Sequence, residues 1–184
     1  MTTSKRLLLL ALMLLLAACG EKVGQKPPAD PNTRAELEWD DLIPADWQPE
    51  KLLADYDADN LEDDDPRAAE LMDRLKALWA EAPVVDGFDG QLVKLPGFVV
   101  PLTTDATEIP EFLLVPYFGA CIHVPPPPAN QTVHVLTADG AAYRGELFDT
   151  VWVEGRMRVT PFSDELGDAG YRIEEAAVSV YEAD

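Results

Sequence analysis

The chain has 184 residues and a formal net charge of −20 at neutral pH, because 34 acidic side chains outnumber 14 basic ones. So acidic a surface excludes a basic nucleic-acid footprint and favours cations or basic proteins as partners. The length suits one domain of ordinary size behind any targeting segment.

The N-terminus has the pattern of an export signal with a lipid attachment site. An apolar run at residues 7–16 follows two basic residues and is too short to remain as a membrane span. Residues 16–19, LAAC, then match the lipobox of bacterial lipoproteins, in which Cys19 becomes the lipidated first residue. The several acyl chains of such an anchor hold the protein stably in a membrane. Gly20 follows Cys19 where an aspartate would resemble an inner-membrane retention signal, so the outer membrane is favoured. We therefore expect a signal peptide over 1–18 and a periplasm-facing protein in the cell envelope.

A tether and a helical arm are expected next. Residues 19–36 carry glycines and prolines without apolar periodicity, which is typical of a flexible tether. The helical arm is expected over residues 37–83. The stretch at residues 36–55 is too apolar for a linker, so we expect it to pack against the main body. Pro66 suits the first position of a helix and Pro83 ends it. One face of that helix is apolar, through Leu71, Met72, Leu75, Leu78 and Trp79.

The acidic loop at residues 55–65, DYDADNLEDDD, invites comparison with a calcium-binding EF-hand. Aspartates occupy the first, third, fifth and ninth positions, at Asp55, Asp57, Asp59 and Asp63. However, Asn60 replaces the required glycine, and Pro66 stands where the bidentate glutamate is needed. We expect diffuse attraction of cations here rather than a specific calcium site.

From residue 84 onward the pattern changes to short strands. They are expected at 91–102, 112–117, 132–137, 151–159 and 171–182. Gly155 inside a strand fits the bend of a barrel, where a side chain would clash. The sequence therefore predicts one mainly β (α+β) domain over 37–184, with its β body at 84–184. We expect a small curved sheet or OB-like barrel with an N-terminal helical arm, and the alternative is a β-sandwich.

The most unusual stretch is VPYFGACIHVPPPPANQ, residues 115–131. Cys121 and His123 share a face if the chain is extended, and His134 lies on the next expected strand. If the three converge, they would suit a zinc or copper ion. The same convergence would alternatively make a Cys–His nucleophile pair for a thiol enzyme.

A structural interpretation of the same stretch stays open beside these two. Four consecutive prolines form polyproline II, which needs an aromatic bed, and the following amides can satisfy free carbonyls. Gly119 would give the tight turn at the start of this crossover. If the proline run is exposed to solvent instead, it offers a surface for binding a partner protein. That surface would comprise Tyr117, Phe118, Pro125, Pro126, Pro127, Pro128, Asn130 and Gln131.

Four segments together resemble the DUF3299 family of small bacterial proteins. They are WDDLIPADW (39–47), LVKLPGFVVPL (92–102), FLLVPYFGACIHVPPPPANQTV (112–133) and VWVEG (151–155). The resemblance covers roughly residues 37–182 and implies a domain without an established activity. It also implies an accessory role beside ABC-type transport components.

No glycine-rich phosphate loop or serine elbow supports an enzyme. We therefore expect a membrane-anchored periplasmic accessory or binding lipoprotein that assists an ABC-type transport or envelope system. The alternatives are a zinc- or copper-binding module and a Cys-dependent enzyme.

Overall fold

The computed structural model describes residues 33–49, 51, 66–103, 108–122 and 126–182. The expected signal peptide, Cys19, the acidic loop, His123 and Pro125 lie outside these residues. The strands are β1 (Ala35–Glu36), β2 (Leu92–Pro101), β3 (Glu111–Val115), β4 (Val133–Thr137), β5 (Thr150–Asp164) and β6 (Gly167–Val180). The helices within these described residues are α3 (Pro66–Ala80) and the 3₁₀ turns η1 (Trp39–Leu42), η3 (Asp86–Phe88) and η4 (Ala129–Gln131). No helix in the described ranges is long and apolar enough to cross a membrane.

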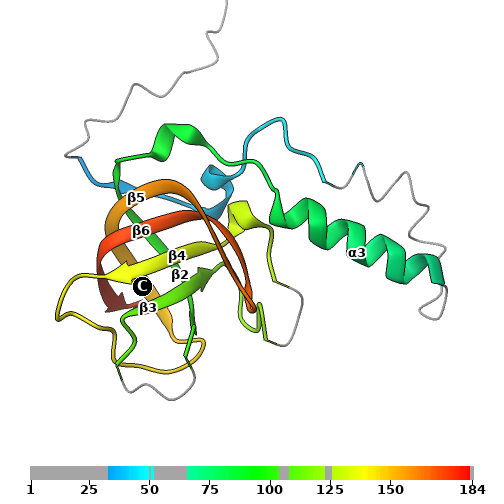
Figure 1. Ribbon diagram of the computed structural model, residues 1–184. Coiled ribbons are helices and arrows are strands. Elements are labelled where there is room, and N and C mark those ends of the chain that lie inside the picture. Colours follow the sequence, from blue (N-terminus) through cyan, green and yellow to red (C-terminus); the bar gives the residue numbers. More distant parts are fainter. Residues whose placement is uncertain (1–32, 50, 52–65, 104–107, 123–125, 183–184) are drawn as a thin grey trace, which may run out of the picture.

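The strands form one strongly curved sheet that closes on itself (Figure 1). Their order is β1-β2-β3-β4-β6-β5, and β5 also pairs with β2 along Leu92–Phe98, which completes a ring. The β4–β6 and β1–β2 pairs are parallel and the others are antiparallel. The predicted mainly β fold with a small curved sheet is thus confirmed, and a β-sandwich does not describe it.

The inside of the ring is an apolar core built by strand alternation. Every strand of the ring contributes fully buried side chains: Val93, Leu95, Val99, Phe112, Leu114, Val133, Val135, Val151, Val153, Met157, Tyr171 and Ile173. Residues of the N-terminal arm complete this core, since Leu37 and Leu42 are also fully buried in it. The arm is held by a hydrogen bond of 2.8 Å from the Trp39 ring Nε1 to the Pro96 carbonyl. This is the packing of the arm on the β body that the sequence predicted.

Gly155 lies where β5 bends against β6, as the sequence predicted. The β5–β6 register shifts between Glu154 and Arg156. A Cβ added at Gly155 would lie 2.6 Å from the main-chain oxygen of Glu174, so only glycine fits without displacing backbone.

The β5–β6 hairpin is longer than the sequence indicated. The two strands were expected at 151–159 and 171–182, but they continue toward each other and meet at a turn through Glu165 and Leu166. Pro161 lies within β5 although proline has no N–H to donate to a neighbouring strand. The register shift between Val159 and Phe162 accommodates it.

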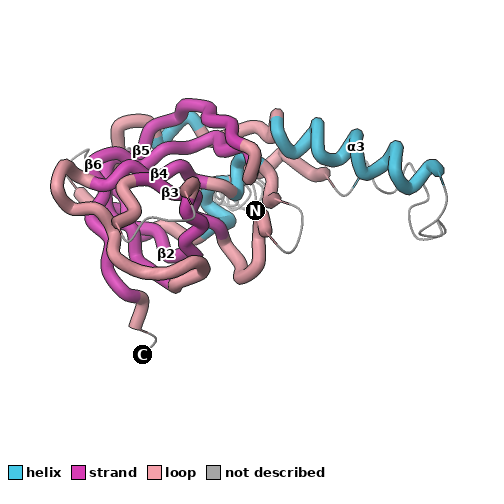
Figure 2. Tube along the Cα trace, turned by 60° about the horizontal axis from the view of Figure 1, so that its bottom comes forward, coloured by secondary structure: helices cyan, strands magenta, loops and turns pink. Residues whose placement is uncertain are grey.

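Helix α3 begins and ends where expected, but its apolar face is only partly covered. The helix extends sideways from the ring of strands (Figures 1 and 2). Leu71 and Leu75 are buried, whereas Met72 and Leu78 are 40% and 41% exposed. The apolar spacing therefore predicted the helix correctly and overestimated its packing.

Candidate functional site

The loop between β3 and β4 inverts the usual relation between residue size and burial. Ala120 is fully buried and Cys121 is half-buried, while Tyr117, Phe118 and Ile122 are exposed. Gly119 has a φ of 86°, so it makes the turn that the sequence predicted. Together with the positive φ of Cys121, 68°, this turn sends the small residue inward and the large ones outward.

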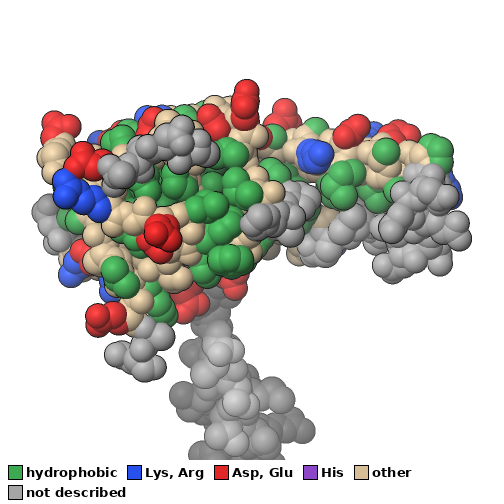
Figure 3. Space-filling model, turned by 90° about the horizontal axis from the view of Figure 1, so that it is seen from below, with side chains coloured by type: hydrophobic (Ala, Val, Ile, Leu, Met, Phe, Trp, Pro, Cys, Tyr) green, Lys and Arg blue, Asp and Glu red, His purple; other side chains and the backbone are tan. Residues whose placement is uncertain are grey.

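We call the exposed side chains of this loop, together with Leu147 of the loop before β5, the apolar end: Tyr117, Phe118, Ile122 and Leu147. Phe118 is 66% exposed and packs its inner side against Phe98 and Phe148, with ring centroids 6.2 and 4.7 Å away. Leu147 precedes Phe148 and lines a groove together with Ile122. Figure 3 shows hydrophobic side chains across the middle of this side of the molecule, with acidic side chains among and around them.

The groove has a volume of about 510 Å³ and lies where the loop that carries Ile122 meets three other connections. The β2–β3 loop contributes Leu102 and Ile109, the loop before β5 contributes Glu146 and Leu147, and the hairpin turn contributes Leu166. This volume is in the range of ligand and side-chain pockets in proteins.

The half-buried position of Cys121 disfavours its thiolate form. Burial raises the pKa of Cys121 to about 11, and no opposite charge offsets this shift. The thiolate is the nucleophilic and metal-ligating form, so a raised pKa disfavours both roles. The thiol lies close to the β5–β6 hairpin, since a Cβ added at Gly167 would lie 3.7 Å from the sulfur.

His134 is held by hydrogen bonds on both ring nitrogens. The Arg172 Nε donates to Nδ1 at 3.3 Å, and Nε2 lies 3.3 Å from the Glu111 carboxylate. Because arginine only donates, Nδ1 is the acceptor and Nε2 carries the proton. The ring is 3% exposed and stacks on Phe162 at 3.8 Å. Burial, the largest cause, lowers the pKa of His134, so the ring is neutral at pH 7.

The structure thus brings two of the three expected metal ligands to the outer face of the sheet without making a metal site of them. Cys121 and Phe162, the ring that stacks on His134, both pack against the same outer cluster of buried side chains. Within the described part of the chain, no three His, Cys, Asp or Glu side chains are placed to hold a metal ion. His123 lies outside the described residues, so the metal hypothesis stays a prediction.

The described prolines, residues 126–128, belong to the connection between β3 and β4. Pro128 has a φ of −57° and a ψ of 154°, as polyproline II requires, and Pro127 is buried. Trp79 lines a groove together with Pro126 and Pro127, so a tryptophan borders the prolines, whereas Phe118 packs on other phenylalanines.

The two amides that follow the prolines tie down the arm. Asn130 Nδ2 donates to the Pro83 carbonyl at 2.9 Å, and Gln131 Nε2 donates to the Trp39 carbonyl at 2.7 Å. The two amide side chains therefore satisfy carbonyls of the arm, not carbonyls of the proline run at residues 125–128. Asn130 is fully buried, and among the described residues of the predicted binding surface Tyr117 and Phe118 are the exposed ones.

Sequence reasoning missed Leu147 and the hairpin turn. Leu147 and Phe148 are an apolar pair between Glu146 and Asp149, and such a pair in a loop was the one available signal. The closeness of Leu147 to Ile122 depends on the fold and is not visible in any local pattern.

Comparison with known proteins gives a family and a related structure. The family model for proteins of unknown function DUF3299 matches residues 39–180. The crystal structure of a DUF3299 family protein from Pseudomonas aeruginosa PAO1 is 40% identical to this chain. The match covers 83% of this chain and 99% of that one, with a TM-score of 0.62. No curated protein matches the sequence.

Proposed function

Because this chain belongs to the DUF3299 family, whose description names no activity, we propose a function from the chain's own surface. The protein is a lipid-anchored, periplasm-facing binding protein that holds a protein partner at its apolar end. It acts as an accessory of an envelope system, and an ABC-type transport complex is the partner class that we propose.

The observation that carries this proposal is the exposure of Phe118 beside a buried Ala120. Leaving a phenylalanine in water forgoes about 1.5–3 kcal/mol of burial free energy. Contiguous exposed apolar surface with a polar border is typical of interaction sites. Of the exposed large hydrophobic side chains in the described part of the chain, half form the apolar end: Tyr117, Phe118, Ile122 and Leu147.

The anchoring part of the proposal is supported by the sequence. The lipobox at residues 16–19 would attach the chain to a membrane through Cys19. A net charge of −20 opposes close contact with anionic headgroups, which leaves the domain free to meet a partner.

Site-specific photocrosslinking in intact cells tests the proposal. A photoreactive amino acid replaces Phe118 or Leu147 in the full-length chain, and the matched control carries it at Met72 on α3. Met72 is also an exposed apolar side chain, so it controls for non-specific capture.

We expect the two positions at the apolar end to give the same discrete crosslinked protein and the Met72 position not to give it. Equal yields from all three positions, or no discrete product from either apolar-end position, would overturn the proposal. Separating inner from outer membranes in the same cells tests the anchor, which requires the wild-type chain in a membrane fraction and the Cys19→Ser chain outside it.

A further inference from the structure

The groove at the apolar end carries charge of one sign. Three acidic residues line it, Glu146, Asp164 and Glu165, and none of its described lining residues is Lys, Arg or His. The rest of the lining is mostly apolar, through Pro101, Leu102, Ile109, Ile122, Leu147 and Leu166. An apolar floor with a charged border is the usual composition of a protein interface.

The acidic residues stand on walls that hydrogen bonds hold in place. Asp164 accepts the Leu166 N–H at 3.1 Å, which fixes the turn that carries Glu165. Asp149 accepts the Glu146 N–H at 2.7 Å and the Tyr143 hydroxyl at 2.8 Å, which fixes the opposite wall. Such walls keep the groove open without a partner, so binding needs little ordering of these loops.

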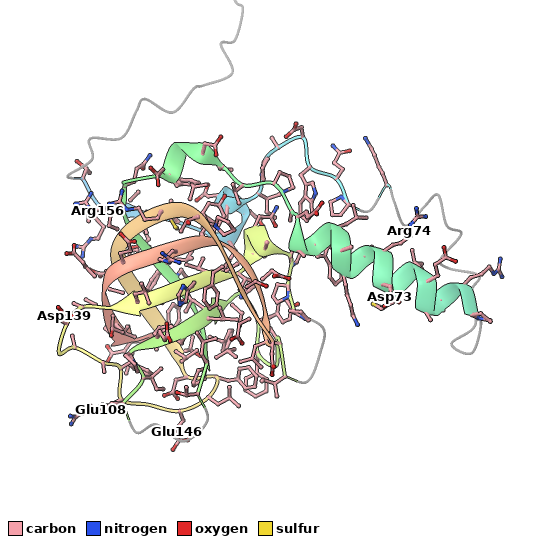
Figure 4. All side chains as sticks on the ribbon, in the orientation of Figure 1. Asp73, Arg74, Glu108, Asp139, Glu146 and Arg156 are labelled. Carbon is pink, nitrogen blue, oxygen red and sulfur yellow. The ribbon has the colours of Figure 1, made fainter. Side chains whose placement is uncertain are left out.

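The neighbouring cations form no ion pair with the three acidic residues of this groove. Arg144 pairs with Glu108, and Figure 4 shows Glu108 and Glu146 at the same end of the molecule. Lys76 lines a second groove that Asp164 and Glu165 also border, and it forms no ion pair with either carboxylate. The acidic border therefore adds to the field of a chain whose net charge is −20.

We infer that the groove receives a basic, apolar segment of the partner polypeptide, with apolar side chains on its floor and Lys or Arg side chains against Glu146 and Glu165. The inference rests on the proposed function and names the chemistry of the partner. Nucleic acid and anionic lipid headgroups would meet like charge here, whereas a basic segment gains both contact area and attraction.

Binding of short synthetic peptides tests the inference. The first peptide carries leucines and lysines, the second has glutamate at each lysine position, and the third has serine at each leucine position. Each carries a fluorophore and is titrated with the full-length chain in nanodiscs of neutral lipid, with empty nanodiscs as the blank. Titrations at about 0.1 M and about 0.5 M salt measure the electrostatic contribution to the affinity of the peptide.

Two pairs of substitutions locate the binding. The groove variant is Glu146→Gln with Glu165→Gln. Its matched control is Glu70→Gln with Asp73→Asn on α3, which changes the net charge equally away from the groove (Figure 4). Leu147→Ser tests the floor, and Leu78→Ser, another exposed leucine, is its control.

We expect only the leucine–lysine peptide to bind, more weakly at the higher salt concentration. The groove variant should weaken its binding about fivefold and Leu147→Ser about tenfold, with both controls near wild type. Equal binding of the serine–lysine peptide would show diffuse attraction to an acidic surface and would overturn the inference. Binding of the glutamate peptide, insensitivity to the groove substitutions, or no binding at all would overturn it too.

The result can be separated from the fate of the proposed function. A discrete crosslink from Leu147 with no peptide binding would support a partner at the apolar end but would reject the inference that its bound segment is basic. Failure of the crosslink together with failure of the peptides would reject both.

Discussion

The hydroxyl of Tyr171, in β6, donates a hydrogen bond of 2.8 Å to the main-chain carbonyl of Leu42, in the N-terminal arm. The same hydroxyl accepts the Val85 N–H at 2.5 Å. One buried side chain from the last strand thus joins the arm and the segment before β2 to the body.

Replacing Tyr171 with phenylalanine leaves a buried carbonyl and a buried N–H without their partner. We expect Tyr171→Phe to lower the free energy of unfolding by about 1–3 kcal/mol. Urea unfolding measures this, with Tyr181→Phe as the control because Tyr181 is an exposed side chain. Equal stability of the two variants would show that this hydroxyl does not hold the arm.

Gly155→Ala tests the bend of β5. Its added methyl would meet the Glu174 carbonyl oxygen at 2.6 Å, so backbone must move, and we expect a loss of about 1–3 kcal/mol. Gly87→Ala is the matched control, since nothing lies within 4 Å of a Cβ at that position. Thermal unfolding of both should show a lower midpoint for Gly155→Ala alone, and an unchanged midpoint would contradict the close approach.

His134 makes the stability of the domain depend on pH. Burial lowers the pKa of His134 in the folded protein, whereas an unfolded histidine titrates near about 6.5. Below that pH the unfolded chain binds a proton that the folded chain does not, so the free energy of unfolding falls as the pH drops. We expect His134→Gln to flatten this dependence between about pH 5 and 6.5, above the range of most carboxylates.

The control for this measurement is His123→Gln, which alters the chain's other histidine. The account requires the pH dependence to change more in His134→Gln than in the control. Identical profiles for wild type and His134→Gln would mean that His134 titrates alike in both states.

Cys121 should react slowly in the folded protein. Because its pKa is raised to about 11 and the side chain is half-buried, little thiolate is present at pH 8. We expect labelling by a thiol reagent to speed up at least tenfold when urea unfolds the chain. Rapid labelling of the native protein would instead favour the thiol-enzyme hypothesis.

The sequence was most informative where the signal is local. Short apolar runs located β2, β3 and β4 closely. Gly155 indicated the bend, because a close approach of backbone favours glycine inside a strand. The helix bounds followed from Pro66 and Pro83.

Contacts between distant segments were not predictable in the same way. The hydrogen bond from Tyr171 to Leu42 joins residues 129 positions apart, and no local sequence pattern predicts it. The apolar end depends on Gly119 and Cys121 having positive φ, which turns Phe118 outward, and on the place where Leu147 comes to lie. Cys121 and His134 were chosen for their chemistry, but their reactivity is set by burial that the sequence does not show.

The affinity of the crosslinked partner for the purified full-length protein tests the central claim most directly. The account predicts that Phe118→Ser with Leu147→Ser weakens binding at least tenfold, because exposed aromatic and aliphatic anchors dominate such interfaces. Met72→Ser with Leu78→Ser, the control on α3, should bind as wild type does. Wild-type affinity in the apolar-end variant, with its fold intact by circular dichroism, would contradict the account.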